Sequence, residues 1–264
     1  MFRQRLLTTL ILVPLALLMI FTSPAWLFQG LMFIVVLGMG WEWGNLIPCR
    51  YLIQKAVFLL GLVAACLMFW FAPNVLAFAS LLAWIVTIMA ILTYPTTLKV
   101  WGRPFVVILQ AYTLLPLFLH SFTAIEALPH GAYWLLYLFG LVWACDIGGY
   151  VMGKLFGKHK MIPHVSPGKT WEGTLGGGLW VAVLAWFGMK GFGITALNAW
   201  VELTFVTWLA AIFGDLSISL LKRRVSIKDT GALLPGHGGI LDRLDSLLAA
   251  APCFYYGLYL LNNG

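Results

Sequence analysis

The sequence predicts an all-α protein that lies in a membrane and crosses it about nine times. Of its 264 residues, 62% are hydrophobic and only 9% are charged, whereas a soluble domain carries roughly 25% charged residues. Apolar stretches recur along the whole chain, and about 20 such residues are enough for one helix to cross a bilayer. Lysine and arginine gather in every second connection between these stretches. An ordinary soluble domain is therefore excluded.

Nine stretches are candidates for membrane-spanning helices, and the fifth and seventh of them are short. They cover residues 5–22, 26–47, 54–72, 75–94, 104–119, 133–152, 173–189, 199–221 and 244–261. The first follows Arg3 and Arg5, as the apolar part of a signal peptide does. The tripeptide Ser23-Pro24-Ala25 is a poor cleavage site, so we expect this helix to be retained.

Basic residues indicate how the spans are oriented. All but Lys190 of the 16 Lys and Arg residues fall in the N-terminal tail or in the even-numbered connections. Because Lys and Arg collect on the cytoplasmic side, we expect a cytoplasmic N-terminus and an extracytoplasmic C-terminus. The net charge of +7 then favours anionic membrane lipids and anionic solutes, and nucleic acid is not indicated.

The two halves of the chain differ in their polar residues. Residues 1–130 carry only two acids, Glu42 and Glu126, and are expected to form a transmembrane scaffold. Residues 131–264 carry the remaining acids and the two longest cytoplasmic connections, 153–172 and 222–243, so we expect this part to be the catalytic region. Glu42 either braces the site or pairs with a cation, and the sequence leaves both roles open.

Acidic residues inside predicted spans are the first functional candidates. A charge at the centre of a membrane helix costs roughly 2.5–3.5 kcal/mol, so Asp146 and Asp215 need partners. Such residues line functional sites far more often than a lipid-facing surface. We therefore expect both to belong to the working site.

Helical spacing groups several of these side chains. Asp215, Ser219 and Lys222 follow an i, i+4, i+7 pattern, and Asp242 and Asp245 follow an i, i+3 pattern, so each set shares one helix face. Carboxylates and a hydroxyl suit Mg²⁺, whereas Lys and Arg suit phosphate. The pattern favours a metal-and-phosphate site. The alternative is that the acids are structural partners of neighbouring Lys and Arg side chains.

Glycines surround the histidine of the last cytoplasmic connection. Gly236, Gly238 and Gly239 flank His237, and Pro235 stiffens the approach. Glycine permits positive φ and lets backbone N–H groups come close to an anion. This pattern is typical of a loop that folds over phosphate groups.

The segment "SPGKT" at residues 166–170 resembles a nucleotide-binding P-loop only in part. A P-loop requires glycine where this chain has Pro163, and no β-strand is expected ahead of the segment. We therefore exclude a P-loop NTPase. Gly168-Lys169-Thr170 stands just before a predicted helix and could bind phosphate through the helix N-terminus and the lysine. An ordinary basic connection is the alternative.

The segment from Ser219 to Asp245 resembles the signature of the phosphatidate cytidylyltransferases, also called CDP-diacylglycerol synthases. Two upstream segments, "DIGGYVMGKLFGKHK" and "SPGKTWEG", are similar to those of bacterial members. The resemblance covers the C-terminal half specifically and the N-terminal half only in general character. The matching signature positions are Ser219, Lys222-Arg223, Lys228-Asp229, His237-Gly238-Gly239, Asp242-Arg243 and Asp245.

The resemblance implies an enzyme that transfers the cytidylyl group of CTP to phosphatidate, giving CDP-diacylglycerol and pyrophosphate for phospholipid biosynthesis. It implies Mg²⁺, with room for a second cation, and a bacterial cytoplasmic (inner) membrane location with the active site facing the cytoplasm. The implied catalytic residues are Asp215, Asp242, Ser219, Lys222, His237 and Asp245. The implied substrate-binding residues are Lys169, Arg223, Lys228, Gly238, Gly239 and Arg243. The implied metal ligands are Asp215 and Asp242, with Asp146 and Asp229 as second choices.

Three other functions are alternatives to this one. A CDP-alcohol phosphotransferase requires an Asp-Gly dipeptide, which this chain lacks. A polyprenyl-phosphate sugar transferase shares the multi-span layout and acidic Mg²⁺ site but does not need this signature. A transporter would use intramembrane acids as an ion pathway, and a flux assay in sealed vesicles would identify it. Small residues in several spans also permit a homodimer.

Overall fold

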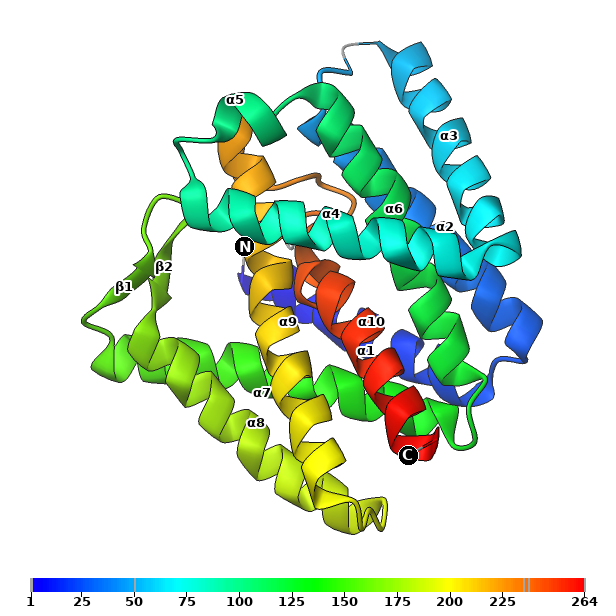
Figure 1. Ribbon diagram of the computed structural model, residues 1–264, viewed down its shortest axis with the longest axis vertical. Helices are drawn as coiled ribbons and strands as arrows, with labels where there is room; N and C mark the ends of the chain where they lie inside the picture. The colour runs from blue at the N-terminus through cyan, green and yellow to red at the C-terminus, as the bar shows by residue number, and fades with distance from the viewer. Residues whose placement is uncertain (1, 50, 235, 237, 264) are drawn as a thin grey trace.

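The computed structural model describes residues 2–49, 51–234, 236 and 238–263 (Figure 1). Helices make up most of the chain, and one short antiparallel hairpin interrupts them. The helices are α1 (Phe2–Thr22), α2 (Ala25–Trp43), the 3₁₀ turn η1 (Gly44–Leu46), α3 (Leu52–Phe71), α4 (Pro73–Thr93), α5 (Leu98–Trp101), α6 (Pro104–Glu126), α7 (Gly131–Phe156), α8 (Trp171–Gly191), α9 (Leu197–Arg224) and α10 (Leu241–Asn263). The strands are β1 (Lys160–Ile162) and β2 (Ser166–Thr170).

Seven helices in the described part of the chain are long and apolar enough to cross a membrane. They are α2 with η1, α3, α4, α6, α7, α9 and α10. The other two predicted spans do form helices, α1 and α8, at the expected positions. Only Leu10–Thr22 of α1 counts as a shorter apolar helix, and several glycines lower the hydropathy of α8. A mainly helical fold with several helices suited to crossing a membrane is confirmed, whereas the count of nine and the orientation stay predictions.

The ends of two helices differ from the expected boundaries. Helix α9 continues to Arg224, so Lys222 and Arg223 lie in its last turn and not in the following connection. Helix α10 begins at Leu241, which places Asp242 in its first turn. Both observed helix ends place charges where the helix dipole favours them, because cations are stabilising near a helix C-terminus and carboxylates near an N-terminus. The connection between the two helices is therefore shorter than residues 222–243.

The segment from Lys160 to Thr170 forms a hairpin, and the expectation of no strand ahead of "SPGKT" was wrong. Strand β1 precedes the segment, which itself forms β2, and Lys160 pairs with Thr170. The segment is still no P-loop, because Pro163 occupies the position that requires glycine. Helix α8 begins directly after it, and the Thr170 side chain caps that helix by accepting from the Gly173 N–H at 3.1 Å.

Glycines bring two pairs of helices close together in the C-terminal half. A Cβ at Gly177 of α8 would lie 2.6 Å from the Cys145 carbonyl oxygen of α7. A Cβ at Gly214 of α9 would likewise collide with the Asp245 carbonyl oxygen of α10. Small residues of this kind let helix backbones approach closely in membranes. Helix α6 is buried at the centre, where α2, α3, α4 and α10 pack against it.

Candidate active site

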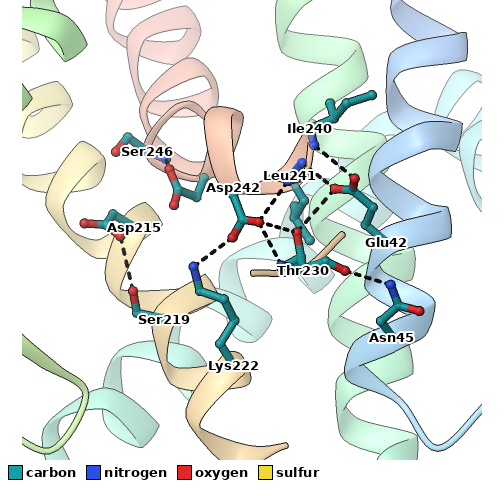
Figure 2. A network of polar contacts seen from close by, with 12 residues as sticks. Glu42, Asn45, Asp215, Ser219, Lys222, Thr230, Ile240, Leu241, Asp242 and Ser246 are labelled. Carbon is teal, nitrogen blue, oxygen red and sulfur yellow. Dashed lines mark hydrogen bonds and ion pairs between the residues drawn. The ribbon is translucent and has the colours of Figure 1, made fainter. Parts of the chain in front are cut away.

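Polar side chains converge where the C-terminal ends of α2 and α9 meet the N-terminal end of α10 (Figure 2). Asp242 is the most heavily bonded of them. Its Oδ1 accepts from Lys222 Nζ at 2.8 Å, and its side chain is only 5% exposed. Its Oδ2 accepts from the backbone N–H and hydroxyl of Thr230 at 2.7 and 2.9 Å, and from the Gly239 N–H at 3.2 Å. The structure thus fixes the orientation of this carboxylate from both sides.

Glu42 holds the same region from the opposite half of the chain. Its side chain is fully buried near the end of α2. It accepts from the backbone N–H groups of Ile240 and Leu241 at 3.1 and 2.8 Å, and from the Thr230 hydroxyl at 3.3 Å (Figure 2). The first N–H groups of a helix have no partner within the helix, and a carboxylate satisfies them while complementing the helix dipole. Of the two roles left open by the sequence, the structure supports the brace.

Two glycines and an amide complete this brace. A Cβ at Gly231 would lie 2.5 Å from Glu42 Oε1, and one at Gly239 would also collide with the carboxylate. Asn45 Nδ2 donates to the Thr230 carbonyl at 2.7 Å. Sequence reasoning missed Asn45 and Thr230, although Thr230 directly follows the Lys228-Asp229 pair of the signature.

Asp215 forms the second paired carboxylate. Its Oδ2 lies 2.7 Å from Lys169 Nζ, and its Oδ1 accepts from the Ser219 hydroxyl at 3.3 Å. Lys169 reaches it from strand β2, so the hairpin is tied to α9 at this point. Arg223 adds a second tie, because its Nε donates to the Val165 carbonyl at 3.1 Å. The helical spacing that placed Asp215 and Ser219 on one face is confirmed.

A cavity of about 450 Å³ opens beside Asp215, between α7, α8, α9 and the hairpin. Asp146, Lys169 and Asp215 contribute charged groups to its wall, and glycines of α7 and α8 form much of the remainder. Lys154 and Tyr150 also line it, with Lys154 Nζ 5.9 Å from the Tyr150 ring centroid. The sequence did not single out these two residues. The cavity is lined by both acidic and basic side chains, which suits an anionic substrate that binds together with a cation.

Two further acids, Asp146 in the cavity wall and Asp245 on α10, lie near enough to Asp215 to interact with it. Asp146 and Asp245 each interact electrostatically with Asp215, as three neighbouring carboxylates do. Across the described residues, no group of three or more His, Cys, Asp or Glu side chains could hold a metal ion. The oxygen donors of Asp215, Ser219 and Asp242 nevertheless suit Mg²⁺, which commonly uses one or two carboxylates and completes its shell with phosphates and water.

Other predicted site residues lie around the loop between α9 and α10. Gly238 has a φ of +86°, as expected for a loop glycine, and Asp229 Oδ1 and Asp242 Oδ2 both lie 3.5 Å from its ideal Cβ position. The Gly239 N–H donates to the chain's own Asp242, and its predicted contact with a phosphate stays a prediction. Lys228 and Arg243 are exposed. His237 lies outside the described residues.

The hairpin is attached at its base by an exposed polar contact. Glu172, in the first turn of α8, accepts from the His159 ring at 2.6 Å and from the Lys158 and His159 backbone N–H groups at 3.2 Å. The hydrogen bond from His159 is the main cause that lowers the pKa of Glu172 from 4.5 to about 2. This contact keeps the strand that carries Lys169 in place beside α9.

Comparison with known proteins identifies the family. The model of the cytidylyltransferase family matches residues 3–261. A phosphatidate cytidylyltransferase of Pseudomonas aeruginosa is 33% identical over 265 residues, which is 96% of each chain. One from Haemophilus influenzae is 40% identical over 187 residues, covering 66% of this chain and 64% of that relative. One from Staphylococcus aureus is 43% identical over 130 residues, about half of each chain.

These matches confirm the resemblance that rested on the segment from Ser219 to Asp245, and they extend it over the scaffold half, where the sequence pattern alone was general. They also confirm that the protein is an enzyme of the nucleotidyltransferase type. The chain belongs to the cytidylyltransferase family that includes the bacterial phosphatidate cytidylyltransferases.

Proposed function

We propose that this enzyme transfers the cytidylyl group of CTP to phosphatidate and releases CDP-diacylglycerol and pyrophosphate. The observation that carries the proposal is a pair of lysine–aspartate contacts: Lys169 with Asp215 in the wall of the cavity, and Lys222 with Asp242 near Asp215 (Figure 2). Relatives that match the chain closely are named for this activity. A cavity at the ends of membrane helices suits one water-soluble and one lipid substrate.

The reaction exchanges one phosphorus–oxygen bond for another. An oxygen of the phosphatidate phosphate attacks the α-phosphorus of CTP and forms a new P–O bond. The bond between the α-phosphorus and the oxygen that bridges to the β-phosphate breaks, and pyrophosphate leaves with that electron pair. The attacking phosphate is already ionised near neutral pH, so the site needs no strong general base. Catalysis then consists of positioning and charge neutralisation.

The cationic side chains are placed to neutralise phosphate charge. Lys169 approaches the cavity from the hairpin, and Lys222 approaches Asp242 from the last turn of α9. In our proposal both ammonium groups move onto phosphate oxygens when the substrates bind. Mg²⁺, held by Asp215 and Asp242 with Ser219 beside them, would supply further neutralisation of the phosphates when bound.

The remaining roles follow from position. Asp146, Asp229 and Asp245 would orient the ligand set or add oxygen donors to it. Arg223, Lys228 and Arg243 would bind phosphate at the rim. We further propose that the site faces the cytoplasm of a bacterial inner membrane. In the predicted nine-span arrangement nearly all basic residues fall on one side of the membrane, and Lys and Arg collect on the cytoplasmic side, where CTP is found. A homodimer stays a prediction.

A labelling assay tests the proposal directly. Purified protein in mixed micelles would receive phosphatidate, α-labelled CTP and Mg²⁺, with EDTA in a parallel sample. We expect label to enter the lipid fraction, and to stay out of it with EDTA. Label transfer that is unaffected by EDTA would contradict the metal role. No transfer by protein shown to be folded would contradict the proposed activity.

A further inference from the structure

An apolar groove lies between α8 and α9. It has a volume of about 420 Å³ and is lined almost entirely by hydrophobic side chains. Thr174 of α8 and Ile212 of α9 line the charged cavity, while Leu175 and Trp208, one and four positions away on the same helices, line the groove. The two spaces therefore lie at neighbouring levels of the same two helices, and the charged cavity is at the end that carries Asp215.

The shape of the groove follows from how its two helices pack. Figure 1 shows α8 and α9 meeting near the turn between residues 191 and 197 and spreading apart toward the hairpin. Helix α8 packs mainly along α7, and α9 packs mainly along α10, so the faces between them stay open. Gly178 lets the Trp208 ring of α9 pack closely against α8, because a Cβ at this position would lie 2.9 Å from the ring.

The groove is long enough to hold an acyl chain of one bilayer leaflet. Its lining runs from Leu175 to Met189 on α8, which corresponds to about 20 Å along a helix. The hydrocarbon core of a bilayer is about 30 Å thick, so the chains of one leaflet extend about 15 Å. Val201 and Phe205 remain about half exposed along its side, so a lipid could enter sideways from the bilayer.

A polar atom stands at the upper end of this apolar lining. The buried indole Nε1 of Trp208 has no hydrogen-bond partner in the described part of the chain. Buried donors of this kind are rare in folded proteins. Trp208 lies about two helical turns from Asp215, which is where the glycerol esters of a lipid would lie if its phosphate reached the cavity.

We propose that this groove between α8 and α9 binds an acyl chain of the lipid acceptor while the lipid phosphate occupies the neighbouring charged cavity. The inference rests on the proposed function, since it assigns the tail of the same substrate. A charged cavity with a neighbouring apolar groove that is long enough for one acyl chain matches the two parts of a phospholipid. The groove would let the enzyme use chain burial to hold a substrate whose head group resembles a free phosphate ester.

Filling the groove tests the proposal. Ala182 lines the middle of the groove, whereas Val183 is exposed on the same helix without lining it. We expect Ala182→Trp to lower kcat/KM for dioleoyl phosphatidate by about tenfold or more, because the chain loses its apolar contacts. Activity with dihexanoyl phosphatidate and the KM for CTP should not change. Val183→Trp, which adds the same indole nearby, should behave as the parent protein does.

Each other outcome contradicts a specific step. The groove proposal would be overturned if Ala182→Trp had the same kcat/KM as the parent protein with both lipids. It would also be overturned if Ala182→Trp lost the same factor in kcat/KM with both lipids. Either result would leave the proposed function intact. No CDP-diacylglycerol from the parent protein with either lipid would overturn the proposed function itself. A phosphatidate with a diazirine on its chain gives a second readout that does not need turnover. It should label α8 or α9 in the parent and not in Ala182→Trp, and label spread over other helices would overturn the inference.

Discussion

The backbone N–H of Leu241 donates to the Glu42 carboxylate across 2.8 Å and joins residues 199 positions apart in the sequence. Through this contact the scaffold half of the chain fixes the first turn of α10. Asp242 lies one residue further along that turn and shares the Thr230 hydroxyl with Glu42 (Figure 2). The two halves of the chain are therefore joined by hydrogen bonds at the candidate site. The N-terminal half helps to position Asp242.

Glu42→Gln tests this link. A glutamine keeps the size but turns an NH₂ group toward N–H donors, so buried donors lose their acceptor. We expect the free energy of unfolding to fall by about 1–3 kcal/mol and kcat to fall more than the KM for CTP rises. Thermal unfolding in detergent and steady-state kinetics would measure both. The exposed Glu202→Gln is the matched control and should change neither. Parental stability and kcat in Glu42→Gln would refute the brace.

Asp242→Asn addresses the chemistry at the same point. The asparagine keeps the side-chain shape and an oxygen for Thr230 but removes the charge that pairs with Lys222. We expect kcat to fall about a hundredfold or more, as when a charge-stabilising group is lost from an active site. The free energy of unfolding should also fall by about 1–3 kcal/mol, because Lys222 loses its buried partner, so turnover is compared at a temperature at which both proteins are folded. Substantial remaining turnover would remove Asp242 from the metal role.

Much of this site follows from local spacing. The i, i+4 relation of Asp215 and Ser219 and the positive φ of Gly238 both depend on neighbours in the sequence. Relations between residues that are close in the sequence can be predicted from one sequence alone. The number and boundaries of the spans were less secure, because glycines lower the hydropathy of α8 and because the charged end of α9 stays helical.

Long-range contacts were beyond such reasoning. Nothing near Glu42 in the sequence shows that Ile240 and Leu241 are its partners, since three-dimensional packing alone brings them together. The hairpin was missed for a different reason. Its strands are only three and five residues long and contain lysine, proline and glycine, which are uncommon in strands.

Lys169→Gln tests whether the hairpin delivers a functional cation. The change removes the ammonium that lies 2.7 Å from Asp215 and leaves a side chain of similar length. We expect kcat/KM for CTP or phosphatidate to fall about tenfold, the scale of one charge-assisted hydrogen bond. Lys160→Gln, on the exposed partner strand, is the control and should leave kcat/KM unchanged. Equal effects of the two variants would point to general surface charge and not to the Lys169–Asp215 contact.

Gly214→Ala tests the close approach of α9 and α10 that positions the acids. The added methyl group would meet the Asp245 and Ser246 backbone, which cannot move aside as a flexible side chain would. We expect the free energy of unfolding to fall by about 1–3 kcal/mol, as in other overpacked interiors. Gly30→Ala is the matched helical control, because nothing lies within 4 Å of its Cβ position. It should be neutral or slightly stabilising, and equal destabilisation by both changes would contradict the packing argument.

The Glu172–His159 contact predicts how the hairpin responds to acid. Because the folded pKa of Glu172 is lowered from 4.5 to about 2, the ionised carboxylate is favoured in the folded hairpin. Its stabilising contribution is complete above pH 4.5 and is lost as the pH falls toward 2. Cleavage within residues 157–170 by an acid-active protease, corrected with an unfolded reference peptide, should therefore rise through this window. Glu172→Gln should already be cleaved readily at pH 4.5, and its cleavage rate should not rise further at lower pH. If the cleavage rates of the two proteins depended on pH in the same way, Glu172 would not be what holds the hairpin.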